Sequence, residues 1–160
     1  MSIEIIPGYS HPRVICGLFT EYTSLLVEGE PQFSQYLQLQ NFQEEMDCLE
    51  KKYGHPQGRL YLALVDGEPA GCIALHRLDL QRCEMKRLYV RPGFRGLGIG
   101  KLLTERVLED ARSIGYHQIL LDTFPFLDRA IAMYRSLGFR EIPKYNNSPV
   151  DTTIYMALDL

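Results

Sequence analysis

Residues 91–101 read Arg91-Pro92-Gly93-Phe94-Arg95-Gly96-Leu97-Gly98-Ile99-Gly100-Lys101, and this stretch decides the fold. Three alternate glycines lie between an apolar run that is typical of a strand and an amphipathic run that is typical of a helix. Glycine permits positive φ angles and a close approach of a ligand to the main chain. The start of a helix offers unpaired amide N–H groups and the positive end of its dipole. The segment therefore predicts an anion site, most naturally for phosphate, with Arg95 and Lys101 adding positive charge.

The spacing of the glycines excludes two common phosphate-binding loops. A nucleotide P-loop needs glycine at the position of Arg95 and a serine or threonine where Leu102 stands. A dinucleotide-binding loop needs glycine at the position of Lys101. A nucleotide-dependent kinase is thus disfavoured. The simplest alternative is a glycine-rich turn without a ligand, but such a turn would carry the entropic cost of a third glycine that it does not need.

The rest of the chain alternates between apolar patterns of period two and of period 3.6, which predict strands and helices. We expect strands over residues 2–6, Arg59–Val65, Ala70–Leu78, Cys83–Val90, His117–Thr123, Phe139–Ile142 and Thr152–Leu158. We expect helices over His11–Glu28, Phe33–Tyr53, Gly98–Ile114 and Leu127–Leu137. Strand, helix and strand over 83–123 predict a right-handed crossover between parallel strands. The predicted fold class is α/β: a single domain over residues 1–160, with one mixed, mostly antiparallel sheet and helices on both faces.

Composition limits the classes of protein to which the chain can belong. The chain has 160 residues, 46% of them hydrophobic and 23% charged, which is typical of a globular domain rather than a disordered chain. A net charge of −3 disfavours a non-specific nucleic-acid binder. The sequence shows neither a membrane-spanning apolar run nor a secretory signal, so we expect a cytoplasmic protein. The four cysteines form no CxxC pair and the four histidines form no HxH or HExxH pair. We therefore expect no metal site, and cysteines that are small, buried and reduced.

Arg95, Gly98 and Gly100 fit the pattern Arg-x-x-Gly-x-Gly. With this pattern the chain resembles the GCN5-related N-acetyltransferase family. The resemblance extends to Glu84–Val90 (EMKRLYV) before the loop and to Ala130–Phe139 (AIAMYRSLGF) after it, and the order of the predicted elements follows the family over roughly residues 2–160. The resemblance implies that the fourth and fifth strands splay apart and that acetyl-CoA, the acyl donor, lies in the gap between them.

The resemblance also implies roles for particular residues. The main chain at the end of the fourth strand would bind the pantetheine arm, and the loop amides, with the lysine that follows them, would bind the diphosphate. The residues are Leu88, Tyr89 and Val90 for the arm, and Arg95, Gly96, Leu97, Gly98, Ile99, Gly100 and Lys101 for the diphosphate. One departure from the family is Leu127, where an asparagine often contacts the cofactor, so that contact is either absent or supplied elsewhere.

Two residues carry the predicted chemistry. The resemblance places Tyr134 at the thioester sulfur as a general acid, and the alternative is an aromatic side chain that packs on the buried face of its helix. Because tyrosine titrates at a pKa of about 10 and a thiol at about 8.5, full proton transfer to the thiolate is uphill, whereas a hydrogen bond to sulfur is not. Glu84 would be the general base for the acceptor ammonium. The alternative for Glu84 is a structural ion pair, with Lys86, Arg87 or Arg82 as its partner.

We therefore expect an N-acetyltransferase that moves an acetyl group from acetyl-CoA to a primary amine of a small molecule or amino-acid-like acceptor by direct attack. The chain contains no Gly-x-Ser-x-Gly motif, which disfavours a covalent acyl-enzyme. By analogy with the family, the acceptor site lies near Phe19, Tyr22, Glu30 and Phe33 and the loop Lys144–Asn147. The alternatives are a peptide or protein acceptor and a non-catalytic coenzyme A-binding sensor. The sequence leaves open whether the protein is a monomer or a homodimer.

Overall fold

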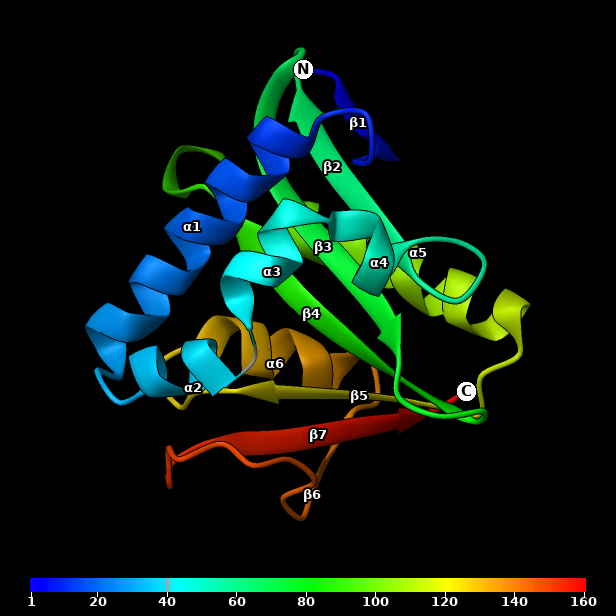
Figure 1. The fold of residues 1–160 in the computed structure, drawn as a ribbon. Coiled ribbons are helices and arrows are strands. Elements are labelled where there is room, and N and C mark those ends of the chain that lie inside the picture. Colours follow the sequence, from blue (N-terminus) through cyan, green and yellow to red (C-terminus); the bar gives the residue numbers. More distant parts are fainter. Residues whose placement is uncertain (40) are drawn as a thin grey trace.

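The fold is built on one mixed, seven-stranded sheet. The structure is a computed structural model that describes residues 1–39 and 41–160. The strands are β1 (Ile3–Pro7), β2 (Arg59–Val65), β3 (Glu68–Arg77), β4 (Arg82–Val90), β5 (Gln118–Thr123), β6 (Arg140–Ile142) and β7 (Ile154–Asp159). Their order across the sheet is β1-β2-β3-β4-β5-β7-β6, and among these strands only the neighbours β4 and β5 run parallel (Figure 1). The expected α/β class with a parallel pair in a mostly antiparallel sheet is confirmed.

Helices connect the strands. Before β2 come α1 (Pro12–Gly29), α2 (Phe33–Leu39), α3 (Phe42–Asp47) and α4 (Leu49–Tyr53). After β4 come a short 3-10 helix, η1 (Pro92–Phe94), and then α5 (Ile99–Ile114) and α6 (Asp128–Ser136). None of these described helices is long and apolar enough to cross a membrane.

The prediction of one helix over Phe33–Tyr53 is wrong. The short helices α2, α3 and α4 take its place, and residue 40 within that range lies outside the described residues. Asn41 has φ 55 before α3, and Cys48 is extended, with φ −147, between α3 and α4. These turns give each helix its own direction, so that Glu45 reaches Arg87 on β4. Apolar periodicity does not register a buried ion pair, which is why the pattern suggested a continuous helix.

The four cysteines are free. Cys72 and Cys83 are buried, Cys16 is half-buried and Cys48 is exposed. The expectation of buried cysteines is therefore wrong for Cys48, because this residue lies at the turn between α3 and α4 rather than inside a helix.

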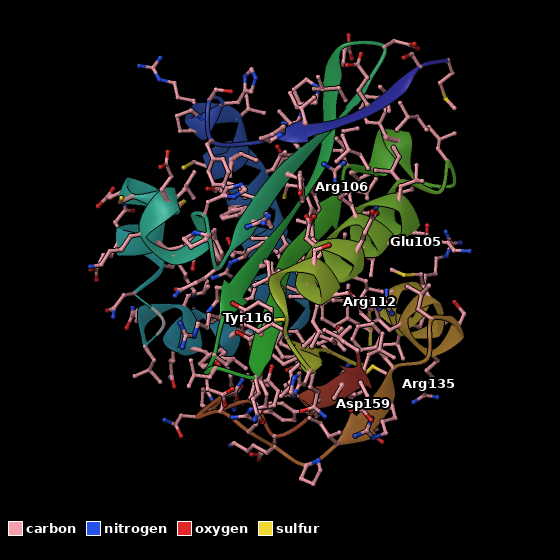
Figure 2. All side chains as sticks on the ribbon, turned by 90° about the vertical axis from the view of Figure 1, so that its right-hand side faces the viewer. Glu105, Arg106, Arg112, Tyr116, Arg135 and Asp159 are labelled. Atoms are coloured by element: carbon pink, nitrogen blue, oxygen red, sulfur yellow. The ribbon has the colours of Figure 1, made fainter. Side chains whose placement is uncertain are left out.

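Two apolar cores lie on opposite faces of the sheet, because successive side chains of a strand point to opposite faces. On β3, Ile73 and Leu75 join the core under α5 and α6, whereas Cys72 and Ala74 join the core under α1 and α4. Figure 1 shows α1 in front of the sheet and α5 behind it. Figure 2 shows charged side chains on the outer side of α5: Glu105, Arg106 and Arg112. The expected placement of helices on both faces is confirmed.

The strands β4 and β5 pair over a short stretch and then diverge. Their register joins Arg82 to Gln118 and ends at the pair of Glu84 with Leu120. Beyond that pair, Figure 1 shows β5 turning away from β4. The splay implied by the family resemblance is thus present, and it begins at Glu84.

A β-bulge shapes the other edge of β4. Cys72 pairs with Tyr89 and Ala74 pairs with Lys86, so that two residues of β4, Arg87 and Leu88, lie opposite one residue of β3. Arg87 has φ 61, a conformation that costs an L-residue roughly 1–2 kcal/mol. Other contacts of Arg87 must therefore hold the bulge in place.

Candidate active site

A cavity occupies the gap between β4 and β5. Because the sheet is open here, both layers of helices reach the cavity: Tyr22 of α1 lines it from one face and Tyr134 of α6 from the other. The strands contribute charged side chains to its wall, namely Lys86, Arg87 and Asp122. The remaining wall is mainly apolar or aromatic and includes Leu26, Phe33, Tyr36, Leu88 and Phe124. A small set of charges inside a largely apolar wall is typical of a site for a small molecule.

The loop after β4 and the start of α5, which the sequence predicts to be an anion site, are called the anion end. Gly96 and Gly98 have φ 84 and φ 80, and Gly98 directly precedes α5. A Cβ atom added at either glycine would meet no described atom within 4 Å. The left-handed backbone rather than crowding therefore requires glycine, and the space over the loop is open. The first amides of α5, from Ile99 onward, have no acceptor within the helix and can bind an anion.

Basic side chains flank this loop and tie it to β4. Arg95 Nε donates to the Val90 carbonyl oxygen at 2.9 Å, and the Arg95 guanidinium lies 5.9 Å from the centre of the Tyr89 ring. Lys101, on the first turn of α5, is exposed, with Nζ 3.9 Å from Glu105 Oε1. Arg95 thus links the predicted loop to the end of β4, the strand whose residues Met85–Leu88 line the cavity.

Tyr134 reaches the cavity from α6 and is buried. Its ring packs against Phe139, with the ring centres 5.6 Å apart. Burial raises the pKa of the Tyr134 phenol well above its ordinary value of about 10. The hydroxyl therefore stays protonated and is suited to donate a hydrogen bond rather than to give up its proton. The two interpretations of this residue are compatible, because the same side chain packs in the core and lines the cavity.

Glu84 is buried, and several groups hold its carboxylate. His76 Nε2 lies 2.7 Å from Oε1, the Tyr145 hydroxyl donates to Oε2, and Lys86 Nζ lies 3.9 Å from Oε1. Burial alone would raise the pKa of Glu84, but the charge of Lys86 and the contact with His76 outweigh it and lower the pKa to about 2. The other two partners considered for Glu84 bind elsewhere: Arg87 pairs with Glu45, and Arg82 pairs with Asp79.

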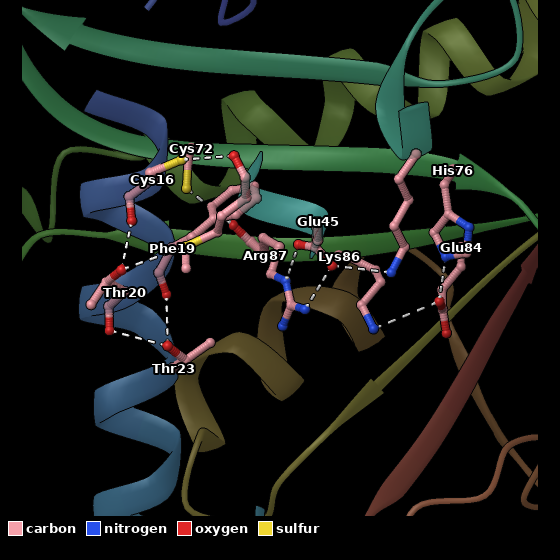
Figure 3. Close-up of polar contacts among 12 residues, drawn as sticks. Cys16, Phe19, Thr20, Thr23, Glu45, Cys72, His76, Glu84, Lys86 and Arg87 are labelled. Atoms are coloured by element: carbon pink, nitrogen blue, oxygen red, sulfur yellow. Dashed lines mark hydrogen bonds and ion pairs between the residues drawn. The ribbon is translucent and has the colours of Figure 1, made fainter. Parts of the chain in front are cut away.

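Arg87 forms a buried ion pair that braces the bulge of β4. Its Nε and Nη2 atoms donate to the two carboxylate oxygens of Glu45, each at 3.0 Å, and Lys52 Nζ donates to Glu45 at 3.1 Å (Figure 3). Burial alone would raise the pKa of Glu45, but Arg87 and Lys52 outweigh it and hold the pKa at about 2. The pair joins α3 to the cavity wall across 42 positions of sequence.

Sequence reasoning missed Asp122, the acidic residue of the cavity wall. Asn146 Nδ2 donates to Asp122 Oδ2 at 2.8 Å, and the Tyr155 hydroxyl donates to Asn146 Oδ1 at 2.9 Å. Burial raises the pKa of the Asp122 carboxyl, although Lys86 opposes the shift. A signal was present in the sequence, because an aspartate inside the apolar run Gln118–Thr123 (QILLDT) is unusual for a buried strand.

This arrangement matches known proteins in sequence. Residues 21–139 match the acetyltransferase (GNAT) family. The chain belongs to this family. It is 35% identical over 142 residues to an uncharacterized N-acetyltransferase of Schizosaccharomyces pombe, an alignment that covers 88% of this chain and 87% of that one. It is 29% identical to an uncharacterized N-acetyltransferase of Dictyostelium discoideum, with all of both chains covered.

Solved structures show the same GNAT fold. An acetyltransferase from Streptococcus agalactiae has a TM-score of 0.77 at 22% identity and covers 99% of this chain and 98% of its own. A GNAT acetyltransferase from Elizabethkingia anophelis with acetyl-CoA bound has a TM-score of 0.56 at 26% identity, with 65% of this chain and 77% of that chain covered. The family drawn from the loop pattern is confirmed, and the enzyme class is a GNAT N-acetyltransferase.

In this GNAT enzyme, only part of the expected acceptor region reaches the cavity. Tyr22 and Phe33 line it, and the loop Lys144–Asn147 supplies the partners of Glu84 and Asp122. Phe19 is fully buried in the core under α1, and Glu30 accepts a hydrogen bond from Thr152 away from the cavity wall. Neither of these two residues lines the described cavity.

Leu127, where this GNAT sequence departs from its family, directly precedes α6. Its side chain makes no capping hydrogen bond and packs beside the small core that contains Phe33 and Phe124. An apolar side chain cannot replace the polar contact of an asparagine. Any polar contact at this end of the site must come from other groups.

Proposed function

We propose that this GNAT N-acetyltransferase transfers the acetyl group of acetyl-CoA to a primary amine of a small molecule or amino-acid-like acceptor, by direct attack of the amine. One observation carries the proposal: the buried Tyr134 lines the cavity between β4 and β5, and the strand β4, which forms part of the cavity wall, leads directly into the glycine loop and the start of α5. The start of α5 packs against the end of β4, because a Cβ atom added at Gly100, on the first turn of α5, would lie 3.9 Å from Val90 Cγ2. A donor with an anionic end and a reactive end fits this site.

The anionic end of the donor fits the loop. In this proposal the amides of Arg95–Gly100, with Lys101, bind the diphosphate at the start of α5. The main chain of Leu88–Val90 binds the pantetheine arm, because this part of β4 has no strand paired to its β5 side and can accept an extended ligand in place of a strand. The acetyl-CoA bound to the Elizabethkingia relative supports the same class of donor here.

The transfer forms a bond between the amine nitrogen and the acetyl carbonyl carbon and breaks the bond between that carbon and sulfur. The acceptor ammonium loses one proton to solvent before its nitrogen attacks and a second proton, which ends on the thiolate, after attack; the net products are an amide, a free thiol and one proton released to solvent. Tyr134, which remains protonated, donates a hydrogen bond to the sulfur as negative charge develops there. It keeps its own proton, because a thiolate with a pKa of about 8.5 is a weaker base than a phenolate.

The contacts of Glu84 favour the ion pair over the general base. A carboxylate with a pKa of about 2 is a weak base, and its oxygens are already engaged by His76 and Tyr145. Glu84 is also not among the described residues that line the cavity. We therefore assign Glu84 a positioning role for Lys86 and Tyr145, and keep proton removal from the acceptor as the rival role.

A screen for thiol release tests the proposed function. The protein is given acetyl-CoA with amino acids, polyamines, aminoglycosides or peptides, and free coenzyme A thiol is measured. Thiol release with small amines is the expected result, whereas release with peptides alone would favour a peptide acceptor. Binding of acetyl-CoA without release from any amine would favour the sensor. Calorimetry that shows no affinity for acetyl-CoA or desulfo-CoA would contradict the proposal itself.

A further inference from the structure

Lys86 is a buried ammonium with spare hydrogen-bond donors. Its side chain is 7% exposed and lines the cavity. Among the described residues its ion-pair partner is Glu84, but Lys86 Nζ lies 3.9 Å from Glu84 Oε1, which is too long for a hydrogen bond (Figure 3). A lysine ammonium has three hydrogen-bond donors, and burying its charge is costly unless these donors are bonded. We therefore expect a ligand inside the cavity to accept hydrogen bonds from Lys86.

Two of the carboxylates near Lys86, Glu84 and Glu45, are already satisfied by other groups. Glu84 is hydrogen-bonded by Tyr145 and contacted by His76, and Glu45 is bonded by Arg87 and Lys52. Breaking either set to serve Lys86 would leave another buried polar group without its partner. An anion that enters the cavity can bind Lys86 at no such cost.

Asp122 lies across the gap from Lys86. The last pair between β4 and β5 joins Glu84 to Leu120. Lys86 lies two positions beyond Glu84, and Asp122 lies two positions beyond Leu120, so both lie on the same face of the sheet as that pair. Both line the same cavity. Asn146 donates to Asp122 Oδ2, and this bond leaves the other carboxylate oxygen able to accept from a ligand.

We propose that the acceptor carries a carboxylate beside its primary amine, as an amino acid does, with Lys86 binding the carboxylate and Asp122 holding the ammonium. The inference rests on the proposed function and narrows its substrate class. A zwitterion brings one charge of each sign to two opposite charges that face each other across the gap. The apolar and aromatic groups around them, among them Leu26, Phe33 and Phe124, suit the carbon skeleton of such a molecule.

Matched substrates test the carboxylate. Alanine, leucine and phenylalanine are each supplied as the free acid, the carboxamide and the decarboxylated amine, and kcat/KM is measured by thiol release. The wild-type protein should prefer the free acid of at least one set, and Lys86→Met should lower kcat/KM for that acid at least about tenfold more than for its decarboxylated amine. For each substrate, kcat/KM of the variant is divided by kcat/KM of the wild type. The different intrinsic basicities of the amines cancel in this ratio.

Control variants separate this role from others. Lys51→Met removes a lysine whose side chain is 72% exposed and should leave the preference unchanged. Lys86→Arg, which keeps the charge, should restore part of the preference. An equal loss on acids and amines in Lys86→Met would instead mean that Lys86 acts on the thioester or on the fold, and would overturn the inference. Asp122→Asn provides a second variant, with thermal melting to show that it folds; it should lower kcat/KM for every amine, including the decarboxylated one.

A binding measurement decides the inference independently of turnover. Calorimetry follows the same amino acids as they bind to the protein saturated with desulfo-CoA. Binding that is lost in Lys86→Met and kept in Lys51→Met supports the inference, whereas absence of amino-acid binding, or binding of the amines alone, overturns it. Failure of the proposed function is a different result, in which acetyl-CoA does not bind or no amine releases thiol.

Discussion

The two ends of the site are built in different ways. The proposed anion end is one continuous segment, from the end of β4 to the first turn of α5, and would bind its ligand through main-chain amides. The proposed acceptor end is assembled from α1, α2, β4, β5, α6 and the loop before β7, and would bind its ligand through buried side chains. A main-chain site depends on local backbone angles, whereas a side-chain site depends on every element that packs around it. Substitutions at the two ends should therefore fail in different ways.

The largest effect should follow from removing the charge that braces the acceptor end. Glu45→Gln removes the carboxylate charge that pairs with the buried Arg87 guanidinium and should lower the free energy of unfolding by about 3–5 kcal/mol, measured by urea denaturation at neutral pH. Glu44→Gln is the control, because Glu44 pairs with Lys51 at the same 3.1 Å that separates Glu45 from Lys52, but 62% of its side chain is exposed. The control should lose less than about 1 kcal/mol. Similar losses in both variants would show that burial does not matter for this pair.

At the anion end, a single backbone position should control donor binding. Gly98→Val forces a β-branched residue into φ 80 and disturbs the amides at the start of α5. We expect acetyl-CoA to bind about 100- to 1,000-fold more weakly by calorimetry, since several hydrogen bonds to a charged group are lost together. Gly115→Val, at φ 106 after the opposite end of α5, imposes similar strain away from the loop. If it weakens binding equally, general destabilisation rather than the anion site is the cause.

Tyr134 lines the cavity, and its hydroxyl should affect the chemical step alone. Tyr134→Phe should lower kcat by about 100-fold with little change in the KM for acetyl-CoA, because a donor to the developing thiolate is lost while the ring remains. Tyr116→Phe removes another buried hydroxyl, which donates to the Gln57 carbonyl oxygen, and should leave kcat unchanged. An unaltered kcat in Tyr134→Phe would remove this tyrosine from the mechanism.

The smallest effect on turnover should come from Glu84→Gln. At pH 7 about one molecule in 2,500 of a lysine-like amine is neutral, compared with about one in ten of an α-amine. Loss of a general base would therefore lower turnover of alkylamine acceptors far more than turnover of α-amino acceptors. The positioning role predicts a loss of about tenfold or less that is no greater on alkylamines than on α-amino acceptors, whose carboxylate Lys86 would bind. A selective loss on alkylamines would restore Glu84 as the base.

The stability of Glu84→Gln should also depend on pH. The folded structure lowers the pKa of Glu84 from 4.5 to about 2, so this carboxylate stabilises the fold at pH values above 4.5. As the pH falls from 4.5 towards 2, the wild-type protein takes up this proton and the contribution disappears. The difference in unfolding free energy between the wild type and the variant should therefore be greatest at neutral pH and should shrink in acid. A difference that stays constant down to pH 2 would contradict the ion pair.

The backbone of the loop and the start of α5 could be predicted because the information for them is local. Gly96 and Gly98 adopt positive φ angles that the sequence shows directly as glycines, and α5 follows them with an unbroken apolar stripe. The strands were predictable for the same reason, since alternation along a few residues shows which face is buried. The error in the predicted helices falls in the segment from Phe33 to Tyr53, where the chain turns so that Glu45 can reach a partner 42 residues away.

By itself, then, the sequence determined the fold class, the parallel crossover and the position of the glycine loop, because each depends on neighbours along the chain. Only the tertiary structure decided that Glu84 sits among His76, Lys86 and Tyr145, and that Lys86 and Asp122 line one cavity. The physical reason is that charges act over distance in space, and a buried charge takes its role from whichever groups the packed elements bring within a few ångströms of it.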